Sequence, residues 1–428
     1  MRFIHFADCH LDGYREEKLS RLGFENFTKV IDAALENEVD FVLLAGDLFN
    51  TALPRVDVLK ETVEQLRRLY EQDIPVYTVP GSHDFSPRGR TMLDVLEKAE
   101  LITNVVKGSV SEKGKLQLKL TRDEKTGTLI TGLLGKKGML DKHYYEDLDR
   151  EHLKREIDGG AGAMTIFMFH TAISELKPKD LEHMQAAPIS FMPEGFDYYA
   201  GGHVHITSRY STTTYPNVVY PGPTFPNNFA ELEKLGSGTY VYYDSEAEFT
   251  DGNGTTTHFK HVKLDGRPVL PLTIDLSGTA YEAVSIMLKE LEKHDVEKKI
   301  VLLRLHGTLA EGKVSEIEFN DVLKHCYDNG AFIVLKNTNK LSSKMFEEVV
   351  VNEDSTDSIE ETTIDEHLGT IKLPEGYDEK ETVDTLMMVL DQEQLDGEKK
   401  STFVERIKQE TKDAIEQKKE GTRQGFPE

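Results

Sequence analysis

The chain has 428 residues, with 76 Asp and Glu against 51 Lys and Arg, and its formal net charge is −25. This length is enough for two or three domains, and the absence of a long apolar run excludes a membrane span. The negative charge argues against a polyanionic partner, but about half of the excess lies after residue 340. Bound divalent cations would also reverse the sign of the local charge at a site lined with carboxylates.

The first residues leave no room for a signal peptide, because an apolar strand pattern begins directly after Met1. We therefore expect a cytoplasmic protein that does not associate with a membrane. Only two cysteines are present, Cys9 and Cys326, and they are far apart in the sequence, which argues against a disulfide framework. We expect both thiols to be small core residues.

Strand and helix patterns alternate in the N-terminal part of the chain. The expected strands cover residues 2–7, 41–45 and 74–79, and the expected helices cover 16–37 and about 54–72. This β-α-β-α-β order predicts a parallel sheet. A third helix is expected to begin near Thr91.

The pattern changes after Leu101. Leu116, Leu118 and Leu120 alternate with polar residues, which favours a second, more antiparallel sheet packed against the first. The segments that follow are a charged helix over 141–157, strand and helix patterns over 164–200, and short strands over 217–264. The expected fold class is therefore α/β, with a two-sheet sandwich flanked by helices over residues 1–268.

The C-terminal part divides into three segments. Residues 269–340 read as a small β-α-β-α-β accessory domain, and residues 341–380 as an acidic linker. Residues 381–428 contain two helical patterns with apolar stripes on otherwise charged faces. These helices either pack back on the main body or form a docking segment for a partner.

Five strand patterns end in a carboxylate or an imidazole. The side chains at these ends are Asp8 and His10, Asp47, His83 and Asp84, His170, and His203 and His205. Residues two apart on a strand share a face, and we expect all of these groups to collect at one sheet edge. Two carboxylates and several imidazoles are too many ligands for one divalent ion with an open position, and they suit two ions bridged by a carboxylate.

Each of these residues also has an ordinary structural interpretation. An Asp at a strand end can cap a helix, and a His beside Gly can be a turn residue. Independent caps and turns would not require two Asp/His or His/His pairs spaced two apart, so the ordered set favours a dinuclear site. Ligation by nitrogen and oxygen without thiolate favours Mn²⁺, Fe²⁺ or Zn²⁺ over Mg²⁺ or Ca²⁺.

The ordered set resembles the calcineurin-like metallophosphoesterases, whose signature is D-x-H, GD, GNH[DE], H and GHxH. Here the motifs are Asp8-Cys9-His10, Gly46-Asp47, Gly81-Ser82-His83-Asp84, His170 and Gly202-His203-Val204-His205. The segments Gly46-Asp47-Leu48-Phe49-Asn50 and Tyr220-Pro221-Gly222 look like those of double-strand-break repair nucleases of the SbcD type. The resemblance implies a metallophosphoesterase sandwich with an accessory capping domain and C-terminal helices.

The resemblance also implies roles for these residues. Asp8, His10 and His205 would hold one ion and His170 and His203 the other, with Asp47 as the bridge. Two divalent ions, expected to be Mn²⁺, would bind the scissile phosphate and activate a water. His83 would protonate the leaving oxygen, with Asp84 orienting or supporting it.

Position 82 departs from the family signature, because Ser82 stands where the family has a metal-ligating Asn. A hydroxyl is shorter than an amide and is a poorer neutral donor. We therefore expect Ser82 to be a weak ligand and the second metal site to have a lower affinity.

The leading functional hypothesis is a metal-dependent DNA nuclease of double-strand-break repair, with exonuclease and endonuclease character. The resemblance implies a homodimer whose C-terminal helices bind a coiled-coil ATPase. One alternative is a phosphoesterase that acts on a small phosphodiester or a phosphoprotein. Another is a non-catalytic DNA-binding or assembly subunit, in which the second metal ion is no longer bound because Ser82 replaces the ligand.

Overall fold

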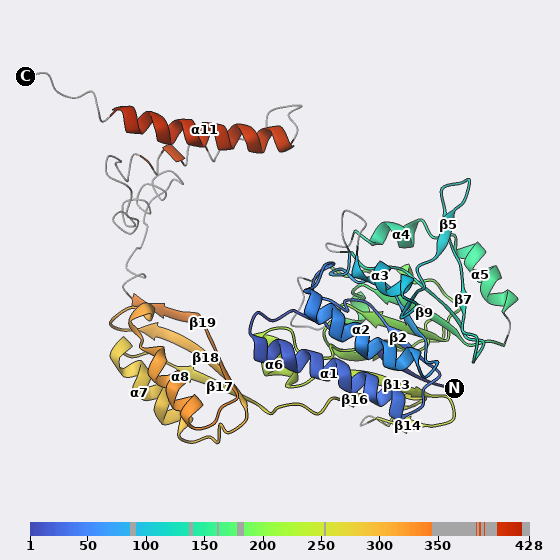
Figure 1. Cartoon of the computed structure of the whole chain (residues 1–428), viewed down its shortest axis with the longest axis horizontal. Helices are drawn as coiled ribbons and strands as arrows, with labels where there is room; N and C mark the ends of the chain where they lie inside the picture. The colour runs from blue at the N-terminus through green and yellow to red at the C-terminus, as the bar shows by residue number, and fades with distance from the viewer. Residues whose placement is uncertain are drawn as a thin grey trace, which may run out of the picture. The chain divides into compact units, whose positions relative to one another are not determined.

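The computed structural model describes residues 1–85, 91–136, 140–160, 162–177, 184–251, 254–344 and 400–421, together with Thr382, Thr385, Leu386 and Val389. The chain forms two compact units, Met1–Ser343 and Lys344–Glu428. Figure 1 labels many of the helices and strands.

The first sheet of the larger unit has six strands in the order β16-β13-β1-β2-β3-β4. Its strands are β1 (Arg2–Phe6), β2 (Phe41–Leu44), β3 (Val76–Thr78), β4 (Thr103–Asn104), β13 (Thr239–Asp244) and β16 (Phe259–Lys263). Strands β1 to β4 pair in parallel, which confirms the sequence prediction, whereas β13 and β16 are antiparallel. The crossover helices are α1 (Glu17–Glu36), α2 (Val56–Tyr70) and α3 (Met92–Lys98), and Thr91 caps α3 as its position predicts.

The second sheet also has six strands, in the order β11-β12-β10-β9-β8-β7. They are β7 (Thr121–Arg122), β8 (Leu129–Gly132), β9 (Thr165–His170), β10 (Tyr198–Gly202), β11 (Thr207–Tyr210) and β12 (Val218–Pro221). The expectation of a more antiparallel sheet is wrong, because β8, β9, β10 and β12 pair in parallel and only the two edge strands are antiparallel. The alternating leucines that suggested it belong largely to a separate hairpin of β5 (Gly108–Val110) and β6 (Leu116–Leu118).

Several short elements connect the strands of the two sheets. The charged helix expected over 141–157 is interrupted at Leu148 and forms α4 (Lys142–Glu146) and α5 (Arg150–Gly159). The other connecting elements are η2 (Ser174–Leu176), η4 (Ile189–Phe191), α6 (Phe229–Leu235), β14 (Phe249–Thr250) and β15 (Thr256–Thr257).

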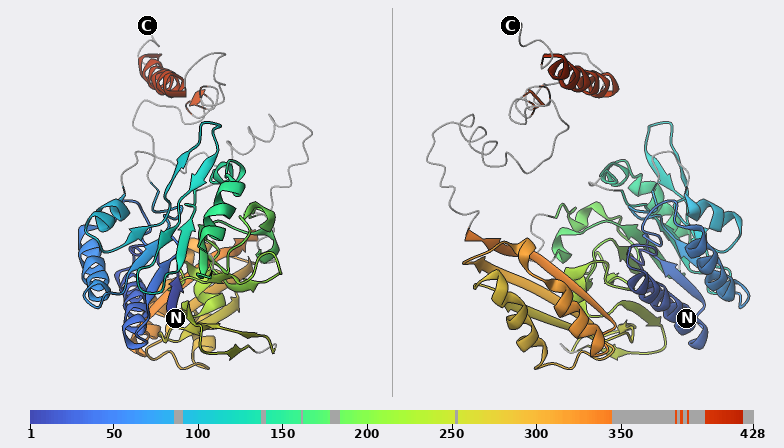
Figure 2. Two further views of the ribbon diagram at one scale, coloured as in Figure 1. Left: turned by 90° about the vertical axis from the view of Figure 1, so that its right-hand side faces the viewer. Right: turned by 60° about the vertical axis from the view of Figure 1, so that its left-hand side comes forward.

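The two sheets pack face to face around a buried core. Alternate residues of β1 and β2, such as Phe3 and Phe41, face β9 and β10, where they meet Ile166 and Tyr198. The other residues of the same strands, such as Ile4, pack against α1 and α2. The result is the α/β two-sheet sandwich flanked by helices that the sequence predicts. Figure 2 shows this layering from two further directions.

The accessory region forms a parallel three-stranded sheet in the order β17-β18-β19. Its elements are β17 (Val269–Asp275), α7 (Ala280–Leu291), β18 (Ile300–Leu309), η5 (Val314–Glu316), α8 (Phe319–Asp328) and β19 (Ile333–Ser343). Helices α7 and α8 cover one face of the sheet, as Figure 2 shows. This order matches the predicted β-α-β-α-β unit, while the division of the larger unit near residue 268 stays a prediction.

The smaller unit is described mainly through α11 (Lys400–Gly421). The acidic linker expected over 341–380 lies outside the described residues beyond position 344, and so does most of the first expected C-terminal helix. Across the part of the chain that the structure describes, we find no helix with the length and apolar character that a bilayer crossing requires.

Candidate metal centre

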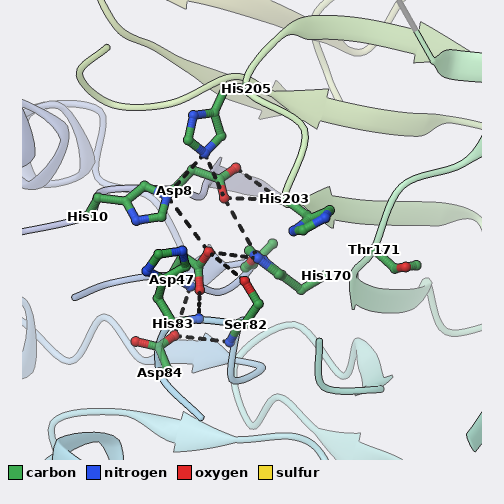
Figure 3. A network of polar contacts seen from close by, with 12 residues as sticks. Asp8, His10, Asp47, Ser82, His83, Asp84, His170, Thr171, His203 and His205 are labelled. Carbon is green, nitrogen blue, oxygen red and sulfur yellow. Dashed lines mark hydrogen bonds and ion pairs between the residues drawn. The ribbon is translucent and has the colours of Figure 1, made fainter. Parts of the chain in front are cut away.

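The residues predicted from the five strand ends converge at one place between the two sheets (Figure 3). Asp8 and Asp47 follow β1 and β2 of the first sheet, while His170 ends β9 and His203 follows β10 of the second. The expectation of a single sheet edge is therefore wrong in this respect. The site forms where the carboxyl ends of strands from two packed sheets meet.

Asp8, His10 and His205 form the first cluster of potential ligand atoms. The two Nε2 atoms of His10 and His205 are 3.0 Å apart. His205 Nε2 is also 3.8 Å from Asp8 Oδ1. His205 Nδ1 is 3.0 Å from the Glu231 carboxylate, and a neutral ring that donates its Nδ1–H there presents the lone pair of Nε2. Two imidazole nitrogens held this close to a carboxylate fit a shared cation, because each can then donate its lone pair.

Asp47 stands between this cluster and His170. Asp47 Oδ2 is 3.7 Å from His10 Nε2 and 3.0 Å from His170 Nε2. His170 donates its Nδ1–H to the backbone oxygen of Ala45 at 2.7 Å, which leaves Nε2 directed at Asp47. This central position is the one that a carboxylate bridging two ions requires.

Ser82 and His203 lie on the side of the site near His170. The Ser82 hydroxyl donates to Asp47 Oδ2 at 3.4 Å. The rings of His203 and His170 are edge to face, with centroids 5.2 Å apart. The backbone N–H of His203 donates to both oxygens of Asp8, at 3.0 and 3.1 Å. All seven residues predicted as metal ligands therefore lie together.

His83 packs beside the first cluster, with its ring centroid 4.8 Å from that of His10. Its backbone N–H donates to Asp47 Oδ1 at 2.7 Å, and its Nδ1–H donates to the backbone oxygen of Asn50 at 2.8 Å. The imidazole is therefore oriented by Asn50.

Asp84 was expected to orient or support His83. Its carboxylate accepts the backbone N–H groups of Asp47, Gly81 and Phe49 at 2.8, 3.0 and 3.3 Å. Asp84 thus ties the loop after β3, which carries His83, to the loop after β2.

Burial and charge shift the titration of these groups in opposite directions. Burial lowers the pKa of His10 to about 3 and that of His203 to about 4, so both imidazoles are neutral near pH 7 and can donate lone pairs. Burial raises the pKa of Asp8, and burial together with the charge of Asp47 raises the pKa of Asp84 to about 7. Burial disfavours the charged form of His170, but the adjacent Asp47 outweighs it and raises the pKa of His170 to about 10. The Asp47 carboxylate thus favours a positively charged group at the position beside it.

The backbone of the site is held in an uncommon conformation. Asp8, His10, Asp47 and His203 have positive φ values of 53, 42, 53 and 90°. Such conformations cost about 1–3 kcal/mol each and cluster at functional sites. Gly46 has φ +88°, and a Cβ there would lie 2.3 Å from His170 Nδ1. The loop after β2 therefore requires glycine at this position.

Two contributors to the site escaped the sequence analysis. One is the backbone oxygen of Asn50, which no side-chain pattern can reveal. The other is Glu231 on α6, whose Oε2 is 3.0 Å from His205 Nδ1. The spacing Asn228-x-x-Glu231, a helix-capping pattern, was the available signal for this helix.

Comparison with known proteins identifies the region that carries this site. Residues 1–207 match the calcineurin-like phosphoesterase family. This stretch of the chain is therefore similar to calcineurin-like phosphoesterases. The matched region includes every residue of the predicted site from Asp8 to His205.

Curated relatives extend the similarity over nearly the whole chain. The DNA double-strand break repair protein Mre11 of Archaeoglobus fulgidus is 26% identical over 459 aligned positions, covering 98% of this chain and 96% of the relative. The protein of the same name from Methanococcus maripaludis is 27% identical and covers 84% of this chain and 89% of the relative. That of Methanocaldococcus jannaschii is 28% identical, with 67% and 72% covered. The resemblance inferred from the motifs is confirmed.

Proposed function

We propose that this protein is a metal-dependent DNA nuclease that hydrolyses phosphodiester bonds in double-strand-break repair. The observation that carries the proposal is the convergence of Asp8, His10, Asp47, His170 and His205 inside a phosphoesterase domain. The similarity to double-strand break repair proteins over 98% of the chain supports DNA as the substrate. The accessory sheet and α11 further favour a macromolecular substrate, since a minimal phosphoesterase does not need them.

The chain's own residues fit two divalent cations, with Mn²⁺ favoured by the mixed nitrogen and oxygen donors. Asp8, His10 and His205 would hold one ion. Asp47 would bridge to the other, which His170, His203 and, weakly, Ser82 would hold. Bound ions of this kind neutralise charge on a phosphate and lower the pKa of an attacking water.

The remaining chemistry is the transfer of a proton to the leaving oxygen. The Nδ1–H of His83 is committed to the backbone oxygen of Asn50 at 2.8 Å. Nε2 is therefore the atom that can hold and release a proton, and we assign it to the leaving oxygen. Asp84 acts at a distance from this atom, by holding the loops that carry His83 and Asp47.

We also propose the assembly in which the nuclease works. By similarity to the family, it would be a cytoplasmic homodimer with both exonuclease and endonuclease activity. Its C-terminal helices would bind a coiled-coil ATPase. The apolar side chain of Val404 on α11 is 40% exposed and would be available to such a partner.

The test is hydrolysis of single- and double-stranded DNA by the full chain, with and without Mn²⁺, beside a chromogenic phosphodiester. We expect Mn²⁺-dependent cleavage of DNA and its loss in Asp47→Asn. Cleavage of the chromogenic diester alone would identify a small-substrate phosphoesterase. Failure to cleave any substrate while DNA still binds would identify a non-catalytic subunit, and either result would contradict the proposal.

A further inference from the structure

Helix α6 carries two carboxylates that bind in different parts of the protein. Glu231 Oε2 is 3.0 Å from Nδ1 of His205 in the candidate metal centre. Glu233 binds Arg304 on β18 of the accessory sheet, with N···O distances of 2.6, 2.9 and 3.1 Å. Residues two apart on a helix lie about 200° apart around its axis. The two carboxylates therefore point to opposite sides of α6.

The Glu231 carboxylate is fixed by groups other than His205. Its Oε2 accepts the backbone N–H of Asn227 at 2.8 Å, and its Oε1 accepts the Asn228 amide at 2.6 Å. The Asn228 side chain in turn accepts the backbone N–H of Glu231 at 3.0 Å. Because these bonds hold the carboxylate in place, Glu231 sets both the tautomer and the direction of the His205 ring.

The opposite side of α6 is packed firmly against the accessory sheet. Leu232 is fully buried in an apolar cluster that includes Ile300 and Leu302 of β18. The Arg304 guanidinium, besides binding Glu233, lies over the ring of Phe229 at 5.1 Å from its centroid. The Glu233 and Arg304 side chains are only 26% and 22% exposed. Helix α6 is therefore joined to the accessory sheet by apolar, ionic and cation–π contacts.

We propose that α6 couples the position of the accessory sheet to cation binding at the metal centre. Glu231 is a positioning residue for His205. The Glu233–Arg304 ion pair fixes α6, so that the Glu231 carboxylate stays within hydrogen-bonding distance of the imidazole. Cation binding then favours the arrangement in which the accessory sheet contacts α6, because coupling between two sites is reciprocal. The inference rests on the proposed function only in that His205 is a metal ligand.

Mn²⁺ binding to the metal-free full chain, measured by calorimetry, tests the inner contact. We expect Glu231→Ala to weaken the tightest binding step by about 10–100-fold, the usual effect of losing the partner of a ligating histidine. Glu231→Gln keeps an acceptor for Nδ1–H, so it should recover part of the affinity. Nitrogen NMR shifts of His205 should report Nδ1–H in the parent chain and a mixture of tautomers in Glu231→Ala.

The outer contact is tested by Arg304→Gln and by the exchanged pair Glu233→Arg with Arg304→Glu. We expect Arg304→Gln to weaken Mn²⁺ binding by about 2–30-fold, although Arg304 belongs to the accessory sheet. The exchanged pair should restore the parent affinity. Asp32→Asn removes another ion pair, Arg68–Asp32 at 2.6 Å, which lies outside α6, and should leave affinity unchanged.

The possible outcomes distinguish a failure of the metal site from a failure of the coupling through α6. A parent chain that binds no Mn²⁺ would contradict the metal site itself, and with it the proposed function. Parent binding that is unchanged in both Glu231→Ala and Arg304→Gln would overturn the present inference alone. An effect of Glu231→Ala without one of Arg304→Gln would leave Glu231 as a positioning residue and overturn the coupling.

Discussion

Ser82 donates its hydroxyl to Asp47, with Oγ 3.4 Å from Oδ2 of the central carboxylate. This contact places a short hydroxyl beside His170 and Asp47, where the family signature has an amide. We predict that Ser82→Asn tightens the weaker of two Mn²⁺ binding steps by about tenfold, because the amide oxygen reaches further toward the ion. Calorimetry on the metal-free chain measures both steps.

The control for this change is Ser109→Asn in the exposed strand β5, which introduces the same side chain far from the site. Two equally tight steps in the parent chain, unaffected by Ser82→Asn, would show that position 82 does not limit the second metal.

His83 is predicted to act on the leaving group and not on metal binding. We expect His83→Ala to lower kcat for DNA cleavage by about 10²–10⁴-fold, the contribution of a positioned acid or base. Mn²⁺ stoichiometry and affinity should stay at the parent values. His143→Ala removes an imidazole that is 76% exposed and serves as the control. A parallel loss of metal from His83→Ala would instead make His83 a ligand.

The backbone at Gly46 is predicted to tolerate no side chain. Gly46→Ala adds a Cβ that would lie 2.3 Å from His170 Nδ1 at φ +88°. The left-handed conformation alone costs about 1–2 kcal/mol for a residue with a Cβ. Gly114→Ala, at φ +74° with no atom within 4 Å, supplies a matched control for that conformational cost.

Denaturant unfolding and Mn²⁺ binding should therefore separate these two variants. Both should lose unfolding free energy, but only Gly46→Ala should also lose metal affinity. Equal behaviour of the two would mean that the contact with His170 has no consequence.

His5 is predicted to make stability depend on pH. It lies buried between the Tyr198 hydroxyl and the Gly201 carbonyl, and burial lowers its pKa from 6.5 to about 3. Between those values the unfolded chain binds a proton that the folded chain does not. The contribution of His5 is therefore fully present above pH 6.5 and is lost as the pH falls toward 3.

Replacing His5 with Gln should flatten this dependence. The unfolding free energy of the metal-free parent should fall more steeply below pH 6.5 than that of His5→Gln, by up to about 1.4 kcal/mol per pH unit. Urea unfolding at several pH values, with chelator present, measures the difference. Parallel curves for the two chains would show that His5 is not buried as a neutral imidazole.

The sequence predicts well those features that depend on local pattern. The strands that precede Asp8 and Asp47 and the strand that ends at His170 lie where their apolar runs place them, because a run of that length bounded by Gly or polar residues favours a buried strand. The antiparallel pairing of β1 with β13 could not be predicted, since it joins residues far apart in the sequence.

The site itself was predicted in its residues but not in its supports. Asn50 acts through a backbone oxygen, and its side-chain type carries no information about that contact. Glu231 lies on a helix of seven residues, which is too short to show an apolar period. Its role depends on a tertiary contact with His205, and local pattern contains no trace of such contacts.

The origin of the site from two sheets has a consequence for biosynthesis. Asp8 and Asp47 come from the first sheet, whereas His170, His203 and His205 come from the second. A growing chain therefore has no complete ligand set until residue 205 has left the ribosome and both sheets have closed on each other. Metal binding therefore stabilises only the completed sandwich, and an unfinished or misfolded chain holds no complete metal centre.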